Sequence, residues 1–113
     1  MTQFSTYVRQ TYFTQINNFV AQHTQTSVYR LCLTFYFPTL VNAGWAKSKA
    51  KTRYKRLDVG NRRKLLEDCL SSVLGEIDDS LFFEVVLTKV MGPEKVTIHL
   101  MRVDPADFGV PDV

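Results

Sequence analysis

Two acidic positions and one lysine in this 113-residue chain have side chains suited to phosphate chemistry assisted by a metal. Asp58 precedes a stretch with helical spacing, Lys64 lies within that stretch, and Asp78-Asp79 follow its end. Carboxylate oxygens hold Mg²⁺, a water bound to the metal attacks phosphorus, and a lysine neutralises charge on the phosphate. These residues predict hydrolysis of a phosphate ester as one candidate chemistry.

Each of these residues also has a simpler interpretation. Asp58 is well placed to cap the N-terminus of a helix, and Asp78-Asp79 fit an ordinary acidic turn. A polar stripe between them consists of Asn61, Lys64 and Asp68. The stripe is either a solvated helix face or the wall of a phosphate site, where Asn61 would orient a ligand near the helix N-terminus.

A strongly basic segment surrounds the first acid. Residues 47–64 hold nine of the fourteen Lys and Arg residues and one acid, which gives +8, whereas the other five cations and ten acids give −5. The nine are Lys47, Lys49, Lys51, Arg53, Lys55, Arg56, Arg62, Arg63 and Lys64. Such segregation predicts binding of a nucleic-acid backbone, with Trp45 and Tyr54 either stacking on bases or anchoring the segment.

Composition excludes several other classes. Cys32 and Cys69 have no C-x-x-C spacing, so we expect buried reduced thiols, and the isolated His23 and His99 are expected to be structural. No apolar run approaches the roughly 20 residues of a membrane span, and no signal peptide is visible, so a cytoplasmic protein is expected. No glycine-rich phosphate loop or nucleophile elbow is present, which disfavours the reactions that depend on them.

The elements that must position these residues follow from periodicity. The pattern predicts an amphipathic helix over about 3–22, a strand at Val28–Phe37, a loop over 39–54, a helix from Val59 or Gly60 to Leu74, and a hairpin of Leu81–Val90 with Lys95–Val103. The predicted fold is α+β in the order α-β-α-β-β, with two helices on a small mixed or antiparallel sheet of about three strands. A single domain over 1–103 and a frayed tail over 104–113 are expected.

The second helix separates the two acidic positions. Fifteen helical residues span about 22 Å. Asp58 and Asp78-Asp79 can therefore meet only if the following strand brings them together, or if the second acidic group comes from another chain. The sequence leaves both arrangements open.

The same residues resemble a known family. R-L-D-V-G-N-R-R-K at 56–64 is followed by E-D-C-L at 67–70 and D-D at 78–79. These motifs resemble the RusA family of Holliday junction resolvases, found largely in phages and prophages. The family pattern is a basic residue, D-x-D-N, a Lys one turn later, Asp and Leu on the helix, and a distant D-D pair. The resemblance is close over Arg53 to Val103.

The resemblance implies a small, dimeric, magnesium-dependent enzyme of DNA recombination and repair that cuts four-way junctions symmetrically. By position, Asp58 and Asp79 match motif acids, Asp78 is the neighbour of the second, Asn61 matches the motif Asn and Lys64 matches the catalytic lysine. Asp58, Asp78 and Asp79 would bind Mg²⁺, with Mn²⁺ as a substitute. DNA would contact Asn61 and eight cations: Lys47, Lys49, Lys51, Arg53, Lys55, Arg56, Arg62 and Arg63.

Two departures from the family pattern leave other functions open. Gly60 replaces the second acid of D-x-D-N, and the chain begins at a helix where the family opens with a short strand. The main alternative is a non-catalytic protein that binds branched DNA on the same scaffold. A third possibility is a phage protein that binds a host protein through its basic face. No membrane or small-molecule cofactor is expected in any of the three.

Overall fold

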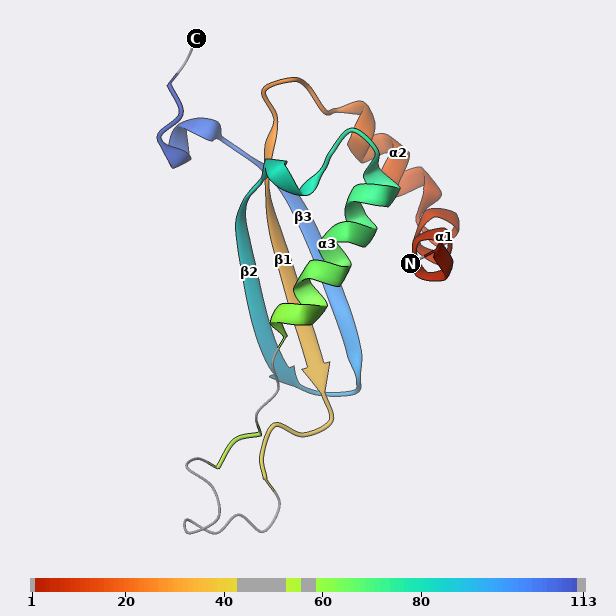
Figure 1. The fold of residues 1–113 in the computed structure, drawn as a ribbon, viewed down its shortest axis with the longest axis vertical. Helices are drawn as coiled ribbons and strands as arrows, with labels where there is room; N and C mark the ends of the chain where they lie inside the picture. The colour runs from red at the N-terminus through yellow and green to blue at the C-terminus, as the bar shows by residue number, and fades with distance from the viewer. Residues whose placement is uncertain (1, 43–52, 56–58, 112–113) are drawn as a thin grey trace.

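A computed structural model describes residues 2–42, 53–55 and 59–111. The described elements are α1 (Thr2–Thr11), α2 (Phe13–Ala21), β1 (Val28–Phe37), α3 (Gly60–Leu74), η1 (Asp79–Leu81), β2 (Phe82–Met91), β3 (Lys95–Val103) and η2 (Pro105–Phe108). Three α-helices accompany a mixed three-stranded sheet (Figure 1). The predicted α+β class is confirmed.

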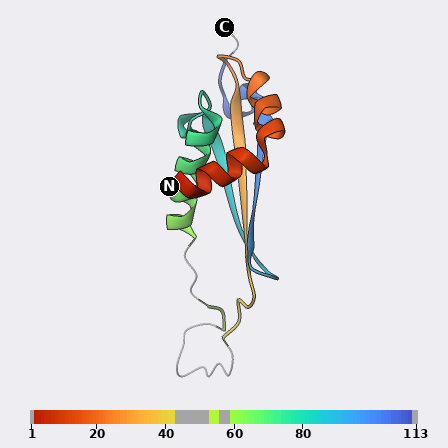
Figure 2. The same cartoon turned by 90° about the vertical axis from the view of Figure 1, so that its right-hand side faces the viewer.

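The first predicted helix is divided at Tyr12. Backbone hydrogen bonds still cross the division, from the Tyr12 amide to Val8 and from the Ile16 amide to Tyr12. Tyr12 itself leaves helical geometry, with φ −115° and ψ 27°. The change of direction lets α1 reach across to α3 while α2 lies beside the sheet (Figure 2). One straight helix could not make both contacts, and no glycine or proline marks the division in the sequence.

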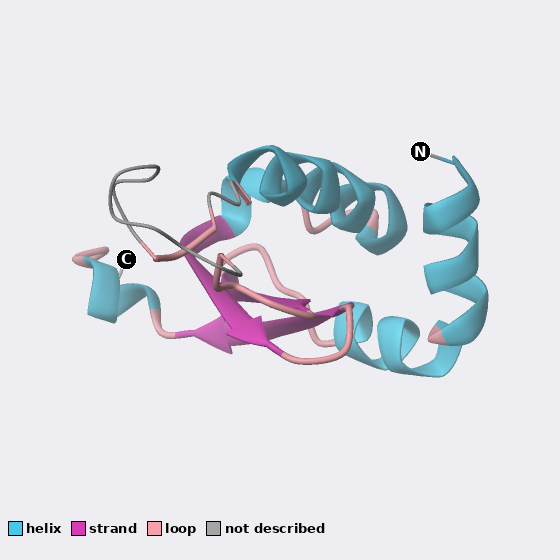
Figure 3. Cartoon of the chain, turned by 90° about the horizontal axis from the view of Figure 1, so that it is seen from below, coloured by secondary structure: helices cyan, strands magenta, loops and turns pink. Residues whose placement is uncertain are grey.

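The strand β1 is the centre of the fold. Its buried positions alternate as predicted for a strand with one face in the core. The alternating residues Tyr29, Leu31, Leu33, Phe35 and Phe37 join Leu70, Leu74, Ile77 and Phe82 in the hydrophobic core. Helix α3 therefore packs its apolar side over this face of the sheet (Figure 3).

The predicted hairpin is wrong in its pairing. The strand order is β2-β1-β3, so β1 lies between the two strands expected to pair. Strand β2 returns from α3 to run parallel to β1, and β3 then pairs antiparallel with the other edge of β1. This order completes the hydrogen bonding of the most buried strand on both sides, and residues 92–94 connect β2 to β3 past its end.

The chain continues in regular structure beyond the predicted domain boundary. The Asp104 side chain accepts a hydrogen bond from the Ala106 amide at 2.9 Å and caps η2. The ring of Phe108 meets Phe83 edge to face, with ring centroids 5.8 Å apart. Part of the segment expected to fray is thus packed on β2. No helix among the described residues is long and apolar enough to cross a bilayer.

Candidate functional site

The predicted site residues lie at the two ends of α3. Its first turn lies at the end of β1, because the Arg62 guanidinium is 5.1 Å from the ring centroid of Phe37. Asn61, Arg62 and Lys64 are all exposed on this half of the helix. These three side chains are therefore available to a ligand at this end.

The described part of the basic segment joins the same end. The Asn42 amide donates to the Arg53 carbonyl at 2.8 Å, and the Lys55 amide donates to the Leu40 carbonyl at 2.9 Å. Since Leu40 and Asn42 closely follow β1, these bonds hold the exposed Arg53 and Lys55 near the first turn of α3. Five predicted site residues lie outside the described part of the chain: Lys47, Lys49, Lys51, Arg56 and Asp58.

Arg63 is partly committed within the helix. Its Nε donates to the Glu67 carboxylate at 2.9 Å, one turn along α3. Glu67 is only 9% exposed, so its charge is compensated locally by this ion pair. Arg63 was predicted to bind DNA, and the structure shows that it also holds a buried carboxylate. The i,i+4 spacing of Arg63 and Glu67 was available in the sequence as a signal.

The two adjacent acids have different local roles. Asp78 accepts hydrogen bonds from the Ser80 amide, at 3.0 Å, and from the Ser80 hydroxyl, and thereby caps η1. Asp79 begins η1 and is exposed. Among the described residues no hydrogen bond or ion pair engages the Asp79 carboxylate. Asp79 is the better available ligand, and Asp78 would have to share its oxygens with Ser80.

One chain does not bring the acids to the first turn of α3. Phe82, which follows η1, pairs with Tyr29 at the start of β1, whereas Arg62 lies over Phe37 at its end. Eight strand residues span about 26 Å. Along the helix, Lys64 is ten residues from Leu74, or about 15 Å. The strand β2 does run back along α3, but Asp78 and Asp79 precede it and stay at the far end.

No group of three His, Cys, Asp or Glu side chains suited to a metal forms within the described ranges. The oxygen donors of Asp78 and Asp79 have the chemistry that Mg²⁺ prefers. Mg²⁺ in proteins is commonly held by one or two carboxylates and keeps several waters, so this pair of side chains has donors of the right kind for such an ion.

Two lysines that the motif analysis did not select lie toward the first turn of α3. Lys89 pairs in register with Phe35, and Lys95 pairs with Tyr36. The Lys95 ammonium is 4.6 Å from the ring centroid of Tyr36. The sequence did offer a signal for both residues: Lys89 lies near the end of the strand predicted at 81–90, and Lys95 begins the strand predicted at 95–103.

The molecule therefore has two ends of opposite charge, at the lower and upper ends of Figure 1. The basic end holds the described cations Arg53, Lys55, Arg62, Arg63, Lys64, Lys89 and Lys95, with acids Glu67, Asp68 and Glu94. The acidic end holds Glu76, Asp78, Asp79, Glu84, Asp104 and Asp107, with cations Arg9, Arg30 and Arg102.

Part of the charge at the acidic end is neutralised internally. The carboxylate of Glu84 accepts a hydrogen bond from Arg30, and this bond, together with the charge of Glu84, raises the pKa of Arg30 above its ordinary value. Arg30 also contacts the Met101 sulfur at 3.6 Å. This pair is a cross-strand contact between β1 and β2, whereas Glu76, Asp78 and Asp79 beyond the end of α3 are exposed.

A small α+β scaffold with a basic surface and separate exposed carboxylates defines a protein of the nucleic-acid-processing class. Residues 2–101 match the family described as endodeoxyribonuclease RusA, so the chain belongs to that family. The chain matches no curated protein and no solved structure.

Proposed function

We propose that this protein is a Mg²⁺-dependent endodeoxyribonuclease that resolves four-way DNA junctions by paired, symmetric hydrolysis of phosphodiester bonds. The observation that carries the proposal is the family match over residues 2–101, with three motif side chains exposed to solvent. These are Asn61, Lys64 and Asp79. The charge of the basic end supports binding to the DNA backbone.

The separation of the two acidic positions supports a site shared by two chains. Asp79 lies at the opposite end of the sheet from the first turn of α3. In a two-fold dimer arranged head to tail, the acidic end of one protomer would lie beside the basic end of its partner. Asp78 and Asp79 of one chain would then complete a metal site with Asp58 of the other. The same symmetry would supply two sites for two scissile strands.

The residues of such a site have separate tasks. Mg²⁺, or Mn²⁺ in its place, would supply charge stabilisation at the phosphate and a water of lowered pKa. The Lys64 ammonium would neutralise charge that develops on the phosphate oxygens. Asn61 would orient the phosphate at the helix N-terminus, where backbone amides favour anions. Arg53 and Lys55 would hold the DNA arms through backbone contacts.

Gly60 is the reason to keep a second candidate. It is the first residue of α3, and the first turn of that helix contains no acid. A site that lacks one motif carboxylate favours a protein that binds branched DNA without cutting it. The two functions differ in the effect of Mg²⁺: a resolvase cuts the DNA strands when Mg²⁺ is added, whereas for a binding protein Mg²⁺ changes only the affinity for DNA.

The first experiment compares an immobile four-way junction with a linear duplex of matched sequence, in Mg²⁺ and in EDTA. Paired symmetric nicks in the junction alone, abolished by EDTA, would support the resolvase. Tight junction binding without nicks in Mg²⁺ or Mn²⁺ would support the binding protein. Equal behaviour toward junction and duplex would contradict both.

The shared site is tested with heterodimers purified through two different affinity tags. One chain carries Lys64→Ala and the other Asp79→Asn. In a shared site the heterodimer keeps one site with both residues, so cleavage of one strand returns. If each chain built its own site, both sites would be defective and no cleavage would return.

A matched control uses the double variant Lys64→Ala/Asp79→Asn paired with the unmodified chain. Here a shared arrangement makes both sites defective, whereas sites within single chains leave one intact. Activity in the control and none in the first heterodimer would overturn the shared site.

A further inference from the structure

The sheet ends in a short, tightly held turn, which we name the sheet tip and define as Tyr36 and residues 91–96. The Gly92 amide donates to the Phe37 carbonyl at 2.9 Å, which fixes the connection against the end of β1. A Cβ at Gly92 would lie 3.2 Å from Cδ1 of Tyr36, closer than ordinary packing. The connection therefore lies directly on the Tyr36 ring, and its position is defined by that contact.

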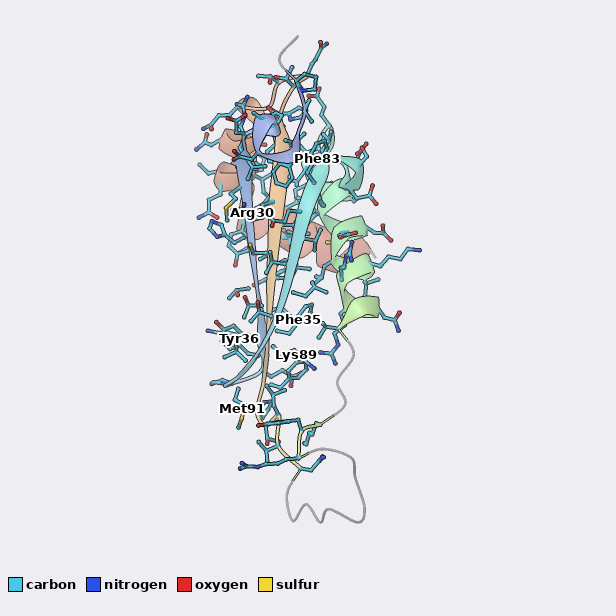
Figure 4. All side chains as sticks on the ribbon, turned by 90° about the vertical axis from the view of Figure 1, so that its left-hand side faces the viewer. Arg30, Phe35, Tyr36, Phe83, Lys89 and Met91 are labelled. Atoms are coloured by element: carbon cyan, nitrogen blue, oxygen red, sulfur yellow. The ribbon has the colours of Figure 1, made fainter. Side chains whose placement is uncertain are left out.

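The sheet tip presents apolar side chains to solvent. Met91 is 51% exposed and Val96 is 43% exposed, and Met91 lies toward the free end of β2 (Figure 4). Single exposed apolar residues are ordinary on protein surfaces. These two are distinctive because they flank one short connection at the basic end of the molecule.

Cations flank the sheet tip on both faces. Tyr36 and Phe37 are successive residues of β1, so their rings point to opposite faces of the sheet. Lys95 lies over Tyr36 and Arg62 lies over Phe37, with charge-to-centroid distances of 4.6 Å and 5.1 Å. Glu94 is the acid of the tip and is exposed. The arrangement is an apolar edge with one cation on each face of the sheet.

We propose that the sheet tip packs against base pairs at the branch point of a four-way junction and thereby selects branched over linear DNA. The inference rests on the proposed function, because it names how the same protein would recognise its substrate. Lys95 and Arg62 would contact phosphates on either side of the tip. Met91 would contact the faces of the bases at the branch.

The energetic basis is the difference in stacking between the two kinds of DNA. An apolar side chain that enters a continuous duplex must break the stacking of a base step, which is unfavourable. Unstacking a base costs least where base pairing or stacking is already interrupted. A branch point offers such an interruption and a linear duplex does not. The same apolar contact would therefore stabilise the junction complex alone.

The test measures dissociation constants for an immobile junction and a matched duplex at one salt concentration. Met91→Ala is expected to weaken junction binding about tenfold and to change duplex binding by less than about twofold, since only the apolar contact is lost. Met91→Leu keeps an apolar side chain and is expected to retain the preference. Val110→Ala, at a residue 40% exposed outside the tip, is the control.

A second readout is the fluorescence of 2-aminopurine placed at the branch point, which rises when the base unstacks. The unmodified protein is expected to raise the signal and Met91→Ala is expected to leave it unchanged. Thermal unfolding of each variant confirms that it folds. Equal junction and duplex losses, or a junction preference or fluorescence rise in Met91→Ala as large as in the unmodified protein, would overturn the role of the tip.

Failure of the proposed function gives a different result. In that case the unmodified protein itself would show no preference for the junction, and the role assigned to the tip would fall with it. A preference in the unmodified protein that survives Met91→Ala would overturn only the present inference.

Discussion

The basic and acidic ends of this molecule are built on the same helix but use their charges differently. At the basic end, Arg62 and Lys95 lie over aromatic rings, and Arg63 is paired with the buried carboxylate of Glu67. At the acidic end, Asp78 is held by Ser80 while its neighbour Asp79 is exposed. The proposed function accordingly assigns DNA binding to the basic end and metal binding to the acidic end.

The largest expected effect is at the acidic end. Asp79→Asn should reduce junction cleavage in Mg²⁺ about a hundredfold or more, since a metal ligand acts directly on the transition state. Junction binding should be unchanged or tighter, because negative charge near phosphate is removed. Single-turnover cleavage and gel-shift affinity measure the two quantities. Cleavage at the unmodified rate would remove Asp79 from the metal site.

The corresponding change at the basic end is Lys64→Ala. We expect slower cleavage by about tenfold to a hundredfold with a smaller loss of affinity, because the ammonium is assigned to charge that develops during reaction. Lys64→Arg keeps the charge and is the matched control. A loss of affinity equal to the loss of rate would make Lys64 a binding residue only.

Charge reversal near the end of β1 should lose binding first. Arg53→Glu and Lys55→Glu each remove a proposed phosphate contact and add repulsion, so affinity should fall about tenfold for each. The dependence of affinity on salt should also become shallower, by about one unit of log–log slope per lost contact. Arg102→Glu reverses the charge of an exposed cation on β3, away from both α3 and η1, and is the control. An unchanged salt slope would place the DNA elsewhere.

The smallest expected effect concerns Asp78. Asp78→Ala removes the cap of η1 and should lower the free energy of unfolding by about 1 kcal/mol, while Asp78→Ser should recover part of it. Denaturant unfolding measures this change. A large loss of cleavage in Asp78→Ser, with stability retained, would show that Asp78 is a metal ligand as well as a cap.

The sequence predicted the local elements well and their partners less well. The bounds of β1 and α3 follow from alternation and helical spacing, and Gly75 follows α3 with φ 66°, a conformation that favours glycine. The hairpin was wrong because a period of two specifies which face a residue occupies and says nothing about which strand lies beside it. The division at Tyr12 arises from tertiary contacts and has no local signal.

For the candidate site, the structure shows that Asn61, Lys64 and Asp79 are exposed, and their roles stay predictions. The length of the helix alone indicated that its two ends, and the acids beside them, lie far apart. Only the observed direction of β2 shows that the chain does not bring Asp78 and Asp79 back to the first turn of α3. Lys95 was missed because its significance depends on the Tyr36 ring beside it, a contact made between strands.

The central position of β1 also determines when this protein can fold. Its neighbours across the sheet are distant in the chain: Arg30 contacts Glu84, 54 residues later, and Met101, 71 residues later. During synthesis the most apolar strand therefore emerges first and waits, with both edges open, until nearly the whole chain has left the ribosome. A nascent chain stalled before β3 would expose a strand edge prone to intermolecular pairing, so chaperone dependence should be greatest for chains truncated there.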